Sequence, residues 1–317
     1  MNNIALIGAG QLGSRYLQGL AALEDSVSVT VVDRSEASLA LARERLAQVP
    51  LASGHEVQFS KSVKDIPQHL DLALVVTPAH CRARVVTDIA SRHQVKAWIL
   101  EKVLAQNCEQ LVQIEQCIAG NNQAWVNTSR RLMGWHQAIR SLLLPEDCSS
   151  MQVSVSGGSW GLACNAIHFI DLVSWWTQAS VQSVNPAGLG DWVQSKRAGF
   201  QEVFGSLQVS YTDGSELELC CHSGHEPTQI TVTTSKGQWV IEESSGRVVG
   251  PIGQELLGQL TFQSALTAPL VKQIFQEGRC DLPTLTESIS QHRPLLTSLL
   301  MHWNQSQGCQ ELIMPIT

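Results

Sequence analysis

The chain has 317 residues, 44% of them hydrophobic and only 15% charged, with a formal net charge of −7. This length is enough for two domains with cores of their own. The negative charge and the lack of a long lysine and arginine run argue against a nucleic-acid partner, and the absence of a long apolar run or cationic leader argues against a membrane partner or secretion.

The first predicted element is a short apolar strand, Ile4–Ile7, which ends in a glycine-rich turn before a helical segment at Tyr16–Leu23. The turn has G-x-G-x-x-G spacing, typical of dinucleotide-binding sites. Gly8 permits a sharp turn, Gly10 lets a pyrophosphate approach the backbone, and Gly13 lets the helix pack closely on the strand. The turn residues expected to contact the cofactor are Gly8, Gly10, Gln11, Leu12 and Gly13.

A second predicted strand, Val27–Val32, ends in Asp33, which lies 20 positions after Gly13. A carboxylate at this distance binds the ribose hydroxyls of the adenosine in dinucleotide-binding folds and repels a 2′-phosphate. The sequence therefore favours NAD over NADP. Arg34 is able to pair with a 2′-phosphate, so NADP is not excluded. The alternative is an ordinary glycine turn followed by a turn acid, and the complete order of strand, turn, helix, strand and acid favours the cofactor site over it.

Strands and helices alternate through the remainder of the first half, which predicts a parallel, doubly wound α/β sheet. We assign residues 1–123 to this NAD(P)-binding Rossmann domain. The further strands are expected at Val57–Ser60, Asp71–Val76, Ala97–Leu100 and Ala124–Asn127, and the further helices at Glu36–Gln48, Cys81–Ser91 and Asn107–Ala119.

The second half, residues 124–317, predicts an α+β domain with a large, mostly antiparallel, open-faced sheet. Asp213-Gly214 between two alternating segments is a strong hairpin signal. Strands are expected at Val181–Ala187, Val203–Tyr211, Glu216–His222, Gln229–Thr234 and Gln238–Glu243, and helices at Leu162–Thr177, Leu260–Glu277 and Thr286–Asn304.

The nine cysteines are odd in number and have no C-x-x-C spacing. A disulfide framework or a zinc site requires paired or closely spaced cysteines. The pattern predicts reduced core thiols in a cytoplasmic protein and no bound metal. The nearest approach to a metal motif, His222-Ser-Gly-His225, is interpreted as a surface turn.

Three further segments complete a family pattern: Val75–His80, Leu100–Ala105 and Gly161–Asp171. Together with the glycine turn, they resemble the Gfo/Idh/MocA (glucose–fructose oxidoreductase/inositol dehydrogenase/MocA) family over nearly the whole chain. The glycine turn is generic, whereas the E-K-x-L-A segment and the helix ending in H-x-I-D are more specific. The resemblance implies a Rossmann domain followed by an open-faced sheet domain, and oxidation or reduction of sugars or cyclitols with NAD(P).

The catalytic lysine of the family corresponds to Lys102, at the predicted carboxyl end of a parallel strand. A lysine there faces the crevice expected to hold the nicotinamide, where it polarises a substrate hydroxyl or carbonyl. Thr77, Pro78, His80 and Glu101 are expected to line the nicotinamide side with it. The alternative is a surface ion pair between Glu101 and Lys102.

The catalytic histidine of the family corresponds to His168, which the resemblance implies as the second acid/base group. On a helix, Cys164, His168 and Asp171 share one face through their spacing, and Asn165 lies close to it. A neutral imidazole at this point accepts the hydroxyl proton as the hydride leaves. Asn165 is expected to orient the substrate. The alternative is a capped or core histidine in an apolar helix.

Two positions depart from the family pattern. Cys164 stands where the family often has an aspartate, and a thiol does not stabilise an imidazolium as a carboxylate does. Val103 stands in place of the usual proline after the lysine, where the family's Lys-Pro bond is often cis. A non-proline cis bond costs about 2.5–4 kcal/mol, so we expect a trans Lys102–Val103 bond and a shifted Lys102.

Arg130 and Arg131 follow a predicted strand and are equally consistent with binding a substrate phosphate or carboxylate and with a solvated surface pair. The segment Leu282–Ser288 resembles family members associated with bacterial surface-sugar pathways. We expect an oxidoreductase of sugars, nucleotide sugars or cyclitols that forms a homo-oligomer through its open sheet face. A dinucleotide-binding regulatory protein without turnover and an NAD-assisted lyase or hydrolase are the alternatives.

Overall fold

The computed structural model describes residues 1–120, 123–143, 150–258 and 260–317. It contains two compact units. The first comprises Met1–Leu104, Gln110–Asn127 and Thr261–Leu285, and the second comprises Ala105–Glu109, Thr128–Leu260 and Thr286–Thr317. A parallel doubly wound sheet in the first unit and a mostly antiparallel sheet in the second confirm the predicted fold class.

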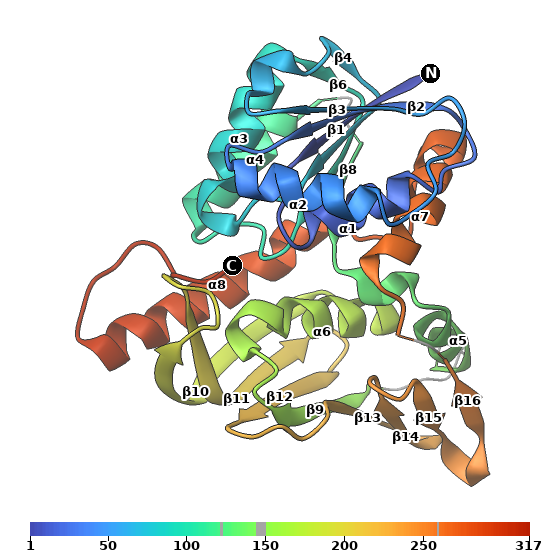
Figure 1. Ribbon diagram of the computed structural model, residues 1–317. Coiled ribbons are helices and arrows are strands. Elements are labelled where there is room, and N and C mark those ends of the chain that lie inside the picture. Colours follow the sequence, from blue (N-terminus) through green and yellow to red (C-terminus); the bar gives the residue numbers. More distant parts are fainter. Residues whose placement is uncertain (121–122, 144–149, 259) are drawn as a thin grey trace. The chain divides into compact units, whose positions relative to one another are not determined.

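The sheet of the first unit has six parallel strands in the order β3-β2-β1-β5-β7-β8 (Figure 1). Its central strand β5 is buried along its whole length, as the continuous apolar sequence predicts. The order changes direction between β1 and β5, which is where such sheets bind dinucleotides. The six strands are β1 (Asn2–Ile7), β2 (Val27–Val32), β3 (Glu56–Ser60), β5 (Leu72–Val75), β7 (Ala97–Glu101) and β8 (Gln123–Asn127).

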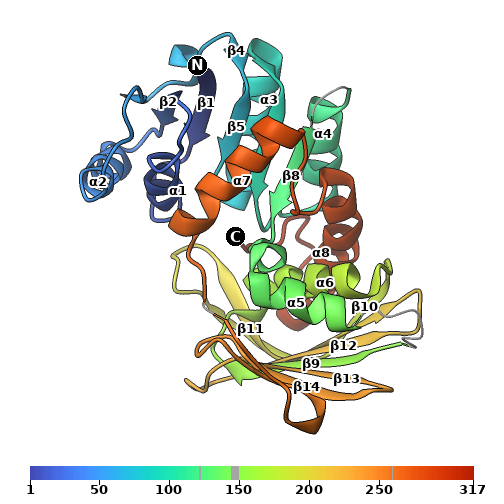
Figure 2. The same ribbon diagram turned by 90° about the vertical axis from the view of Figure 1, so that its right-hand side faces the viewer.

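Helices cover both faces of this sheet, with α1 and α2 on one side and α3 and α4 on the other (Figure 2). Ser35 caps α2 as its sequence suggests, because its hydroxyl accepts a hydrogen bond from the Ser38 N–H at 3.3 Å. The helices are α1 (Gly13–Leu20), α2 (Glu36–Leu46), α3 (Ala79–Arg92), α4 (Cys108–Ile118) and α7 (Gln263–Glu277), and the short elements are η1 (Val63–Asp65), β4 (His69–Leu70) and β6 (Gln94–Val95).

Helix α7 packs closely on α1, although the two are far apart in sequence. Gly19 on α1 makes this approach possible, because a Cβ atom at its position would lie 2.5 Å from the Cβ of Thr267. The segment Thr261–Leu285, which contains α7 and follows the second sheet in the chain, therefore belongs to the first unit.

The second unit contains an eight-stranded sheet in the order β10-β11-β12-β9-β13-β14-β15-β16. All neighbouring strands are antiparallel except β12 and β9, which run parallel. The predicted hairpin is confirmed, because Gly214 has a φ of +83° in the turn between β11 and β12. The strands are β9 (Gln152–Gly158), β10 (Val181–Gln194), β11 (Gln201–Tyr211), β12 (Glu216–His222), β13 (Gln229–Thr234), β14 (Gly237–Glu242), β15 (Arg247–Val249) and β16 (Glu255–Leu257).

One face of this sheet packs under helices, and the other is polar. Leu207 and Leu219 on the helix-covered face are fully buried. Across the other face, Gln208, Glu218 and Ser154 lie side by side on β11, β12 and β9. The helical elements of this unit are η2 (Ser129–Leu132), α5 (Gly134–Leu143), α6 (Leu162–Thr177), η3 (Pro251–Gly253) and α8 (Leu285–Gln307) (Figure 2).

None of the eight cysteines in the described part of the chain forms a disulfide, and of these eight Cys164 and Cys221 are buried. The eight cysteines are therefore thiols, as predicted. The predicted core location is right for two of them only, because most of the others lie on partly exposed faces of helices and strands. Cys148 lies outside the described residues. Within the described residues, no helix has both the length and the apolar character needed to span a membrane.

Candidate functional site

The register of the Rossmann sheet brings the predicted cofactor and catalytic segments to one edge. Ile7 of β1 pairs with Val75 of β5, and Val75 pairs with Leu100 of β7. The residues that follow these three positions therefore leave the sheet at the same level. Gly8 and Lys102 both lie in these loops at the carboxyl edge, where open α/β sheets bind their ligands.

The backbone of the glycine turn needs glycine at Gly8 and Gly13 and is open at Gly10. Gly8 has a φ of +100°, which L side chains rarely adopt. A Cβ at Gly13 would lie 1.8 Å from the Gly8 carbonyl oxygen, so only glycine lets α1 start this close to the turn. A Cβ at Gly10 would meet nothing within 4 Å, which leaves open space beside the backbone. The turn thus fits a pyrophosphate approaching at Gly10 and the start of α1.

The Asp33 carboxylate lies against this turn. Its Oδ2 accepts a hydrogen bond from the Ala9 N–H at 2.8 Å, and its Oδ1 accepts one from the Ser35 N–H at 2.8 Å. Two backbone donors therefore fix the orientation of the carboxylate. Arg34, the next residue, is exposed.

Arg45 of α2 holds the glycine turn from outside, a contact that no sequence motif indicates. Its guanidinium donates to the Gln11 carbonyl oxygen and to the Ser14 hydroxyl, each at 2.7 Å, and also to the Gln11 side chain. Leu12 is the residue that immediately precedes α1. The side chain of Gln11 is thereby engaged within the protein.

The loop after β5 carries three of the predicted nicotinamide-side residues. Pro78 and His80 are exposed, and Thr77 is half-buried. The Thr77 hydroxyl oxygen is buried, and no partner for it is found within the described residues. A buried hydroxyl of this kind fits a site for a polar group such as the nicotinamide amide.

The Lys102–Val103 peptide bond is cis, so the predicted trans bond is wrong. The preference of a non-proline bond for trans is local, whereas the residues after this bond are held by a distant side chain. The buried guanidinium of Arg82 on α3 donates to the carbonyl oxygens of both Val103 and Leu104. Lys102 itself is half-buried.

Glu101 is a buried residue and not half of a surface ion pair, since only 4% of it is exposed. Its Oε1 accepts hydrogen bonds from the Tyr16 hydroxyl at 2.6 Å and from Asn127 Nδ2 at 2.7 Å. Burial, and then the charge of Glu101, raise the pKa of Tyr16 well above its usual value. Tyr16 therefore stays protonated and donates. Sequence reasoning missed Tyr16 because its spacing indicates only a helix.

In the second unit, His168 lies half-buried on α6, near the buried Cys164 and Asp171. Asn165 Nδ2 donates to the Trp160 carbonyl oxygen at 2.8 Å, so this amide is engaged at the start of the helix. Glu202 of β11 accepts from the Ala163 N–H at 2.9 Å. A carboxylate at this end of α6 interacts favourably with the helix dipole.

Arg130 and Arg131 both pair with carboxylates of the second unit. Arg131 holds the fully buried Asp171 through two hydrogen bonds, and the Thr128 hydroxyl donates to the same carboxylate at 2.6 Å. Arg130 holds Glu243 through bonds of 2.6 and 2.7 Å. The solvated pair considered from the sequence is therefore absent for both arginines.

The pair of Arg130 and Glu243 predicts a loss of stability in acid. Burial opposes ionisation of Glu243, but the charge and hydrogen bonds of Arg130, together with His136 Nε2 at 3.4 Å, outweigh it and lower its pKa to about 2. The carboxylate therefore stabilises the fold above its unfolded pKa of about 4.3, by about 3 kcal/mol, and this contribution is lost as the pH falls towards 2.

Urea titrations between pH 7 and 2 test this linkage. We expect Glu243→Gln to be less stable than wild type at pH 7 and to lose less stability over the acid range. Glu218→Gln, on the exposed face of the sheet, is the control and should follow the wild-type pH dependence. A Glu243→Gln variant with the wild-type acid slope would contradict the assignment.

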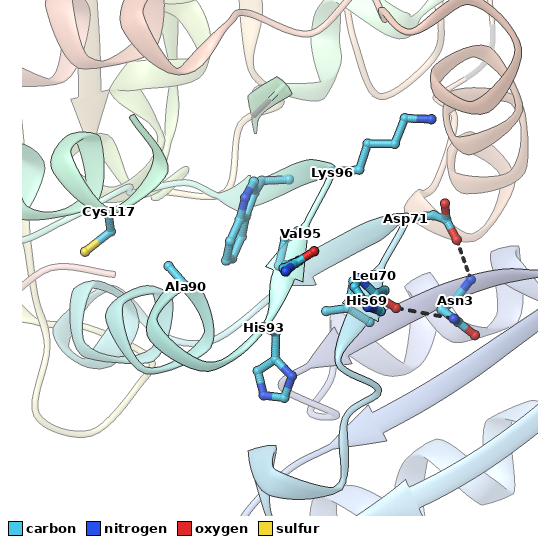
Figure 3. Close-up of a pocket in the computed structure, with 11 residues that line it drawn as sticks. Asn3, His69, Leu70, Asp71, Ala90, His93, Val95, Lys96 and Cys117 are labelled. Atoms are coloured by element: carbon cyan, nitrogen blue, oxygen red, sulfur yellow. Dashed lines mark hydrogen bonds between the residues drawn. The ribbon is translucent and has the colours of Figure 1, made fainter. Parts of the chain in front are cut away.

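A cavity lies at the opposite, amino-terminal edge of the Rossmann sheet, bordered by Asn3, Asp71 and Lys96 (Figure 3). His93 Nε2 and Trp98 Nε1 are buried in its lining, with no partner found among the described residues. Water satisfies such atoms in a polar cavity that is open to solvent. Because dinucleotides bind at the carboxyl ends of the strands, this cavity is not the predicted site.

Comparison with known families finds a match in the N-terminal part of the chain. Residues 2–128 match the family described as "Oxidoreductase family, NAD-binding Rossmann fold". The resemblance expected from the sequence motifs is thereby confirmed. No curated protein is significantly similar to the chain in sequence.

Solved structures match almost the whole chain at low identity. An oxidoreductase from Agrobacterium radiobacter, in complex with NAD+, L-tartaric acid and magnesium, is 14% identical with a TM-score of 0.70 over 96% of each chain. The scyllo-inositol dehydrogenase of Lactobacillus casei, with bound NAD(H) and scyllo-inositol, is 17% identical with a TM-score of 0.66, over 93% of this chain and 95% of that one. UDP-N-acetylglucosamine 3-dehydrogenase of Acidithiobacillus ferrooxidans is 13% identical with a TM-score of 0.68, over 94% and 95%. At these identities the likeness shows the fold.

Proposed function

We propose that this protein, whose residues 2–128 match the Gfo/Idh/MocA oxidoreductase family, is an NAD(H)-dependent oxidoreductase of sugars, nucleotide sugars or cyclitols. The observation that carries the proposal lies within the first unit. The open glycine turn at Gly10, the oriented Asp33 carboxylate and the Lys102 loop all belong to the carboxyl side of one parallel sheet. This is where a dinucleotide and an acid/base group must meet for hydride transfer.

The cofactor would lie with its pyrophosphate at the glycine turn and its adenosine ribose at Asp33. A carboxylate fixed by the Ala9 and Ser35 N–H groups still has lone pairs for ribose hydroxyls. Its negative charge disfavours the 2′-phosphate of NADP, whereas the exposed Arg34 would favour it. We propose NAD as the cofactor because the carboxylate is oriented towards the turn and Arg34 is solvated.

Lys102 would act as the principal acid/base group. In the oxidation direction it accepts the proton of a substrate hydroxyl while the hydride on the same carbon leaves, and a carbonyl forms. The bound nicotinamide supplies the hydride acceptor, or the donor in the reverse direction. His168 is proposed as a second acid/base group, as the family pattern implies. The buried Cys164 beside it cannot stabilise an imidazolium as a carboxylate would, so we assign His168 the lesser effect.

The substrate class is proposed from the solved structures, which include dehydrogenases of scyllo-inositol and of UDP-N-acetylglucosamine. Both compounds carry ring hydroxyls, and a role in bacterial surface-sugar metabolism fits the second. Self-association through the open sheet face also stays a proposal. The row of Gln208, Glu218 and Ser154 on that face means that such an interface would form through polar contacts.

Parallel titrations with NADH and NADPH, followed by tryptophan fluorescence, test the proposed cofactor. We expect NADH to bind more tightly, and Asp33→Ala to weaken NADH binding by about 10- to 100-fold, since a hydrogen bond to a charged group contributes about 1.5–3 kcal/mol. Asp25→Ala, at an exposed acid of the same unit, is the control and should bind as wild type does.

Tight NADH binding would be followed by a screen of sugars, cyclitols and nucleotide sugars, read through the absorbance of the reduced nicotinamide. Preference for NADPH would overturn the NAD assignment. Binding of NADH without turnover on any of these compounds would favour the regulatory alternative.

A further inference from the structure

Lys102 lies between residues that are held rigidly on both sides. Glu101 before it is 4% exposed, and Val103 and Leu104 after it are fully buried. Lys102 is the half-buried member of this stretch. The backbone at Lys102 is therefore held by the contacts that its neighbours make.

The residue before Lys102 is held through its side chain by Tyr16. The Tyr16 hydroxyl donates to Glu101 Oε1 at 2.6 Å, and Tyr16 is fully buried. Asn127, the partner of Glu101 in the sheet, donates to the same oxygen at 2.7 Å. Asn127 also donates to Gln263 at the start of α7, at 2.8 Å. Glu101 is thus fixed from α1 and from the neighbouring strand.

The residues after Lys102 are held through their backbone by Arg82. Its guanidinium, 1% exposed, donates to the carbonyl oxygens of Val103 and Leu104 and also to that of Thr77. Burial lowers the pKa of Arg82 to about 10, so it remains a cation at neutral pH. One buried cation therefore joins the loop that carries Lys102 to the loop that carries Thr77.

We propose that Tyr16 is a positioning residue, which acts through the Glu101 carboxylate to fix the backbone at Lys102. Tyr16 stands on α1, the helix that begins at the glycine turn, so its hydroxyl links the proposed cofactor helix to the strand that ends in the proposed catalytic lysine. The role of Lys102 in this inference rests on the proposed function. A misplacement of about 1 Å caused by a change away from the chemistry can cost about 10²-fold in rate.

The other explanation of this bond is structural, because a buried carboxylate needs donors whatever its role. The chain offers a matched control, since it has only two tyrosines. The hydroxyl of Tyr211 is also buried and donates to the Ile170 carbonyl oxygen at 3.1 Å, within the second unit. Tyr16→Phe and Tyr211→Phe each remove one buried hydroxyl and one hydrogen bond.

Steady-state kinetics separate the two explanations. We expect Tyr16→Phe to lower kcat by about 10- to 100-fold with little change in the NADH dissociation constant, and Tyr211→Phe to leave both unchanged. The deuterium isotope effect on kcat, measured with NADH labelled at C4, should rise in Tyr16→Phe because hydride transfer becomes slower. If Tyr16→Phe and Tyr211→Phe have the same kcat, the positioning role is wrong. It is also wrong if kcat falls in Tyr16→Phe while the isotope effect stays at the wild-type value.

A double variant tests whether Tyr16 acts through Glu101. If it does, Tyr16→Phe/Glu101→Met should have nearly the same kcat as Glu101→Met alone, because methionine has no carboxylate oxygen to accept the Tyr16 hydrogen bond. If the two effects multiply as independent changes do, the proposed route through Glu101 is wrong.

A readout without turnover keeps this inference separate from the proposed function. Reductive methylation with ¹³C-formaldehyde labels the seven lysines, and Lys102→Arg identifies the Lys102 resonance. We expect this resonance to shift in Tyr16→Phe and not in Tyr211→Phe. If the wild type oxidises no substrate but the shift is seen, the proposed function fails and the positioning by Tyr16 stands. An unchanged Lys102 resonance in Tyr16→Phe overturns the inference, whatever the activity.

Discussion

Replacing Lys102 by alanine is expected to lower kcat by about 10²- to 10⁴-fold, the usual contribution of a general acid/base group. The NADH dissociation constant should change little, because the contacts proposed for the pyrophosphate and the adenosine ribose lie at the glycine turn and Asp33. The effect is therefore expected in the chemical step and not in cofactor binding. Stopped-flow measurement of nicotinamide absorbance, together with fluorescence titration of NADH, reports both quantities.

Lys96→Ala is the matched control for this experiment. Lys96 is an exposed lysine of the same unit, and it borders the cavity at the opposite, amino-terminal edge of the sheet. It should leave turnover and cofactor affinity at the wild-type values. Retention of wild-type kcat in Lys102→Ala would show that another group moves the proton. Loss of NADH binding in Lys102→Ala would mean that the lysine holds the cofactor instead.

The parts of the fold that follow from local pattern could be predicted from the sequence. The glycine spacing, the apolar strands and the carboxylate at Asp33 are each readable within a few residues, and the structure has the predicted strands and helices there. Strand β9 was not predicted, although it lies between β12 and β13 in the middle of the second sheet. Its neighbours are some 60 or more residues later in the chain, and no short-range pattern specifies such pairing.

The proposed site also contains residues that a local sequence motif locates and residues that only the structure reveals. Motifs locate Lys102 and His168, because each motif is continuous in sequence. The residues that hold the site are missed. Tyr16 and Glu101 are 85 positions apart, and nothing at Tyr16 distinguishes a hydrogen-bonded tyrosine from a packed one. The cis bond after Lys102 is missed for a related reason, since Arg82 is 21 positions from the Val103 carbonyl oxygen that it binds.

The second large effect is expected at Asp171. This carboxylate is fully buried and accepts hydrogen bonds from Arg131, including one of 2.8 Å from Nε, and one of 2.6 Å from the Thr128 hydroxyl. Asp171→Ala would leave Arg131, itself 6% exposed, as a buried cation without its counter-charge. Breaking a buried pair in this way costs about 3–5 kcal/mol, so the variant should unfold at a much lower urea concentration.

The double variant Arg131→Met/Asp171→Leu distinguishes the loss of the pair from the burial of a single charge. If the cost in Asp171→Ala comes from the unpaired guanidinium, replacing both partners by apolar side chains should recover most of the stability. Asp191→Asn, at an exposed carboxylate of the same unit, should change the free energy of unfolding by no more than about 0.5 kcal/mol. If Asp171→Ala is as stable as wild type, solvent must reach Arg131. If the double variant is no more stable than Asp171→Ala, the cost lies in packing around α6 and not in the buried charge.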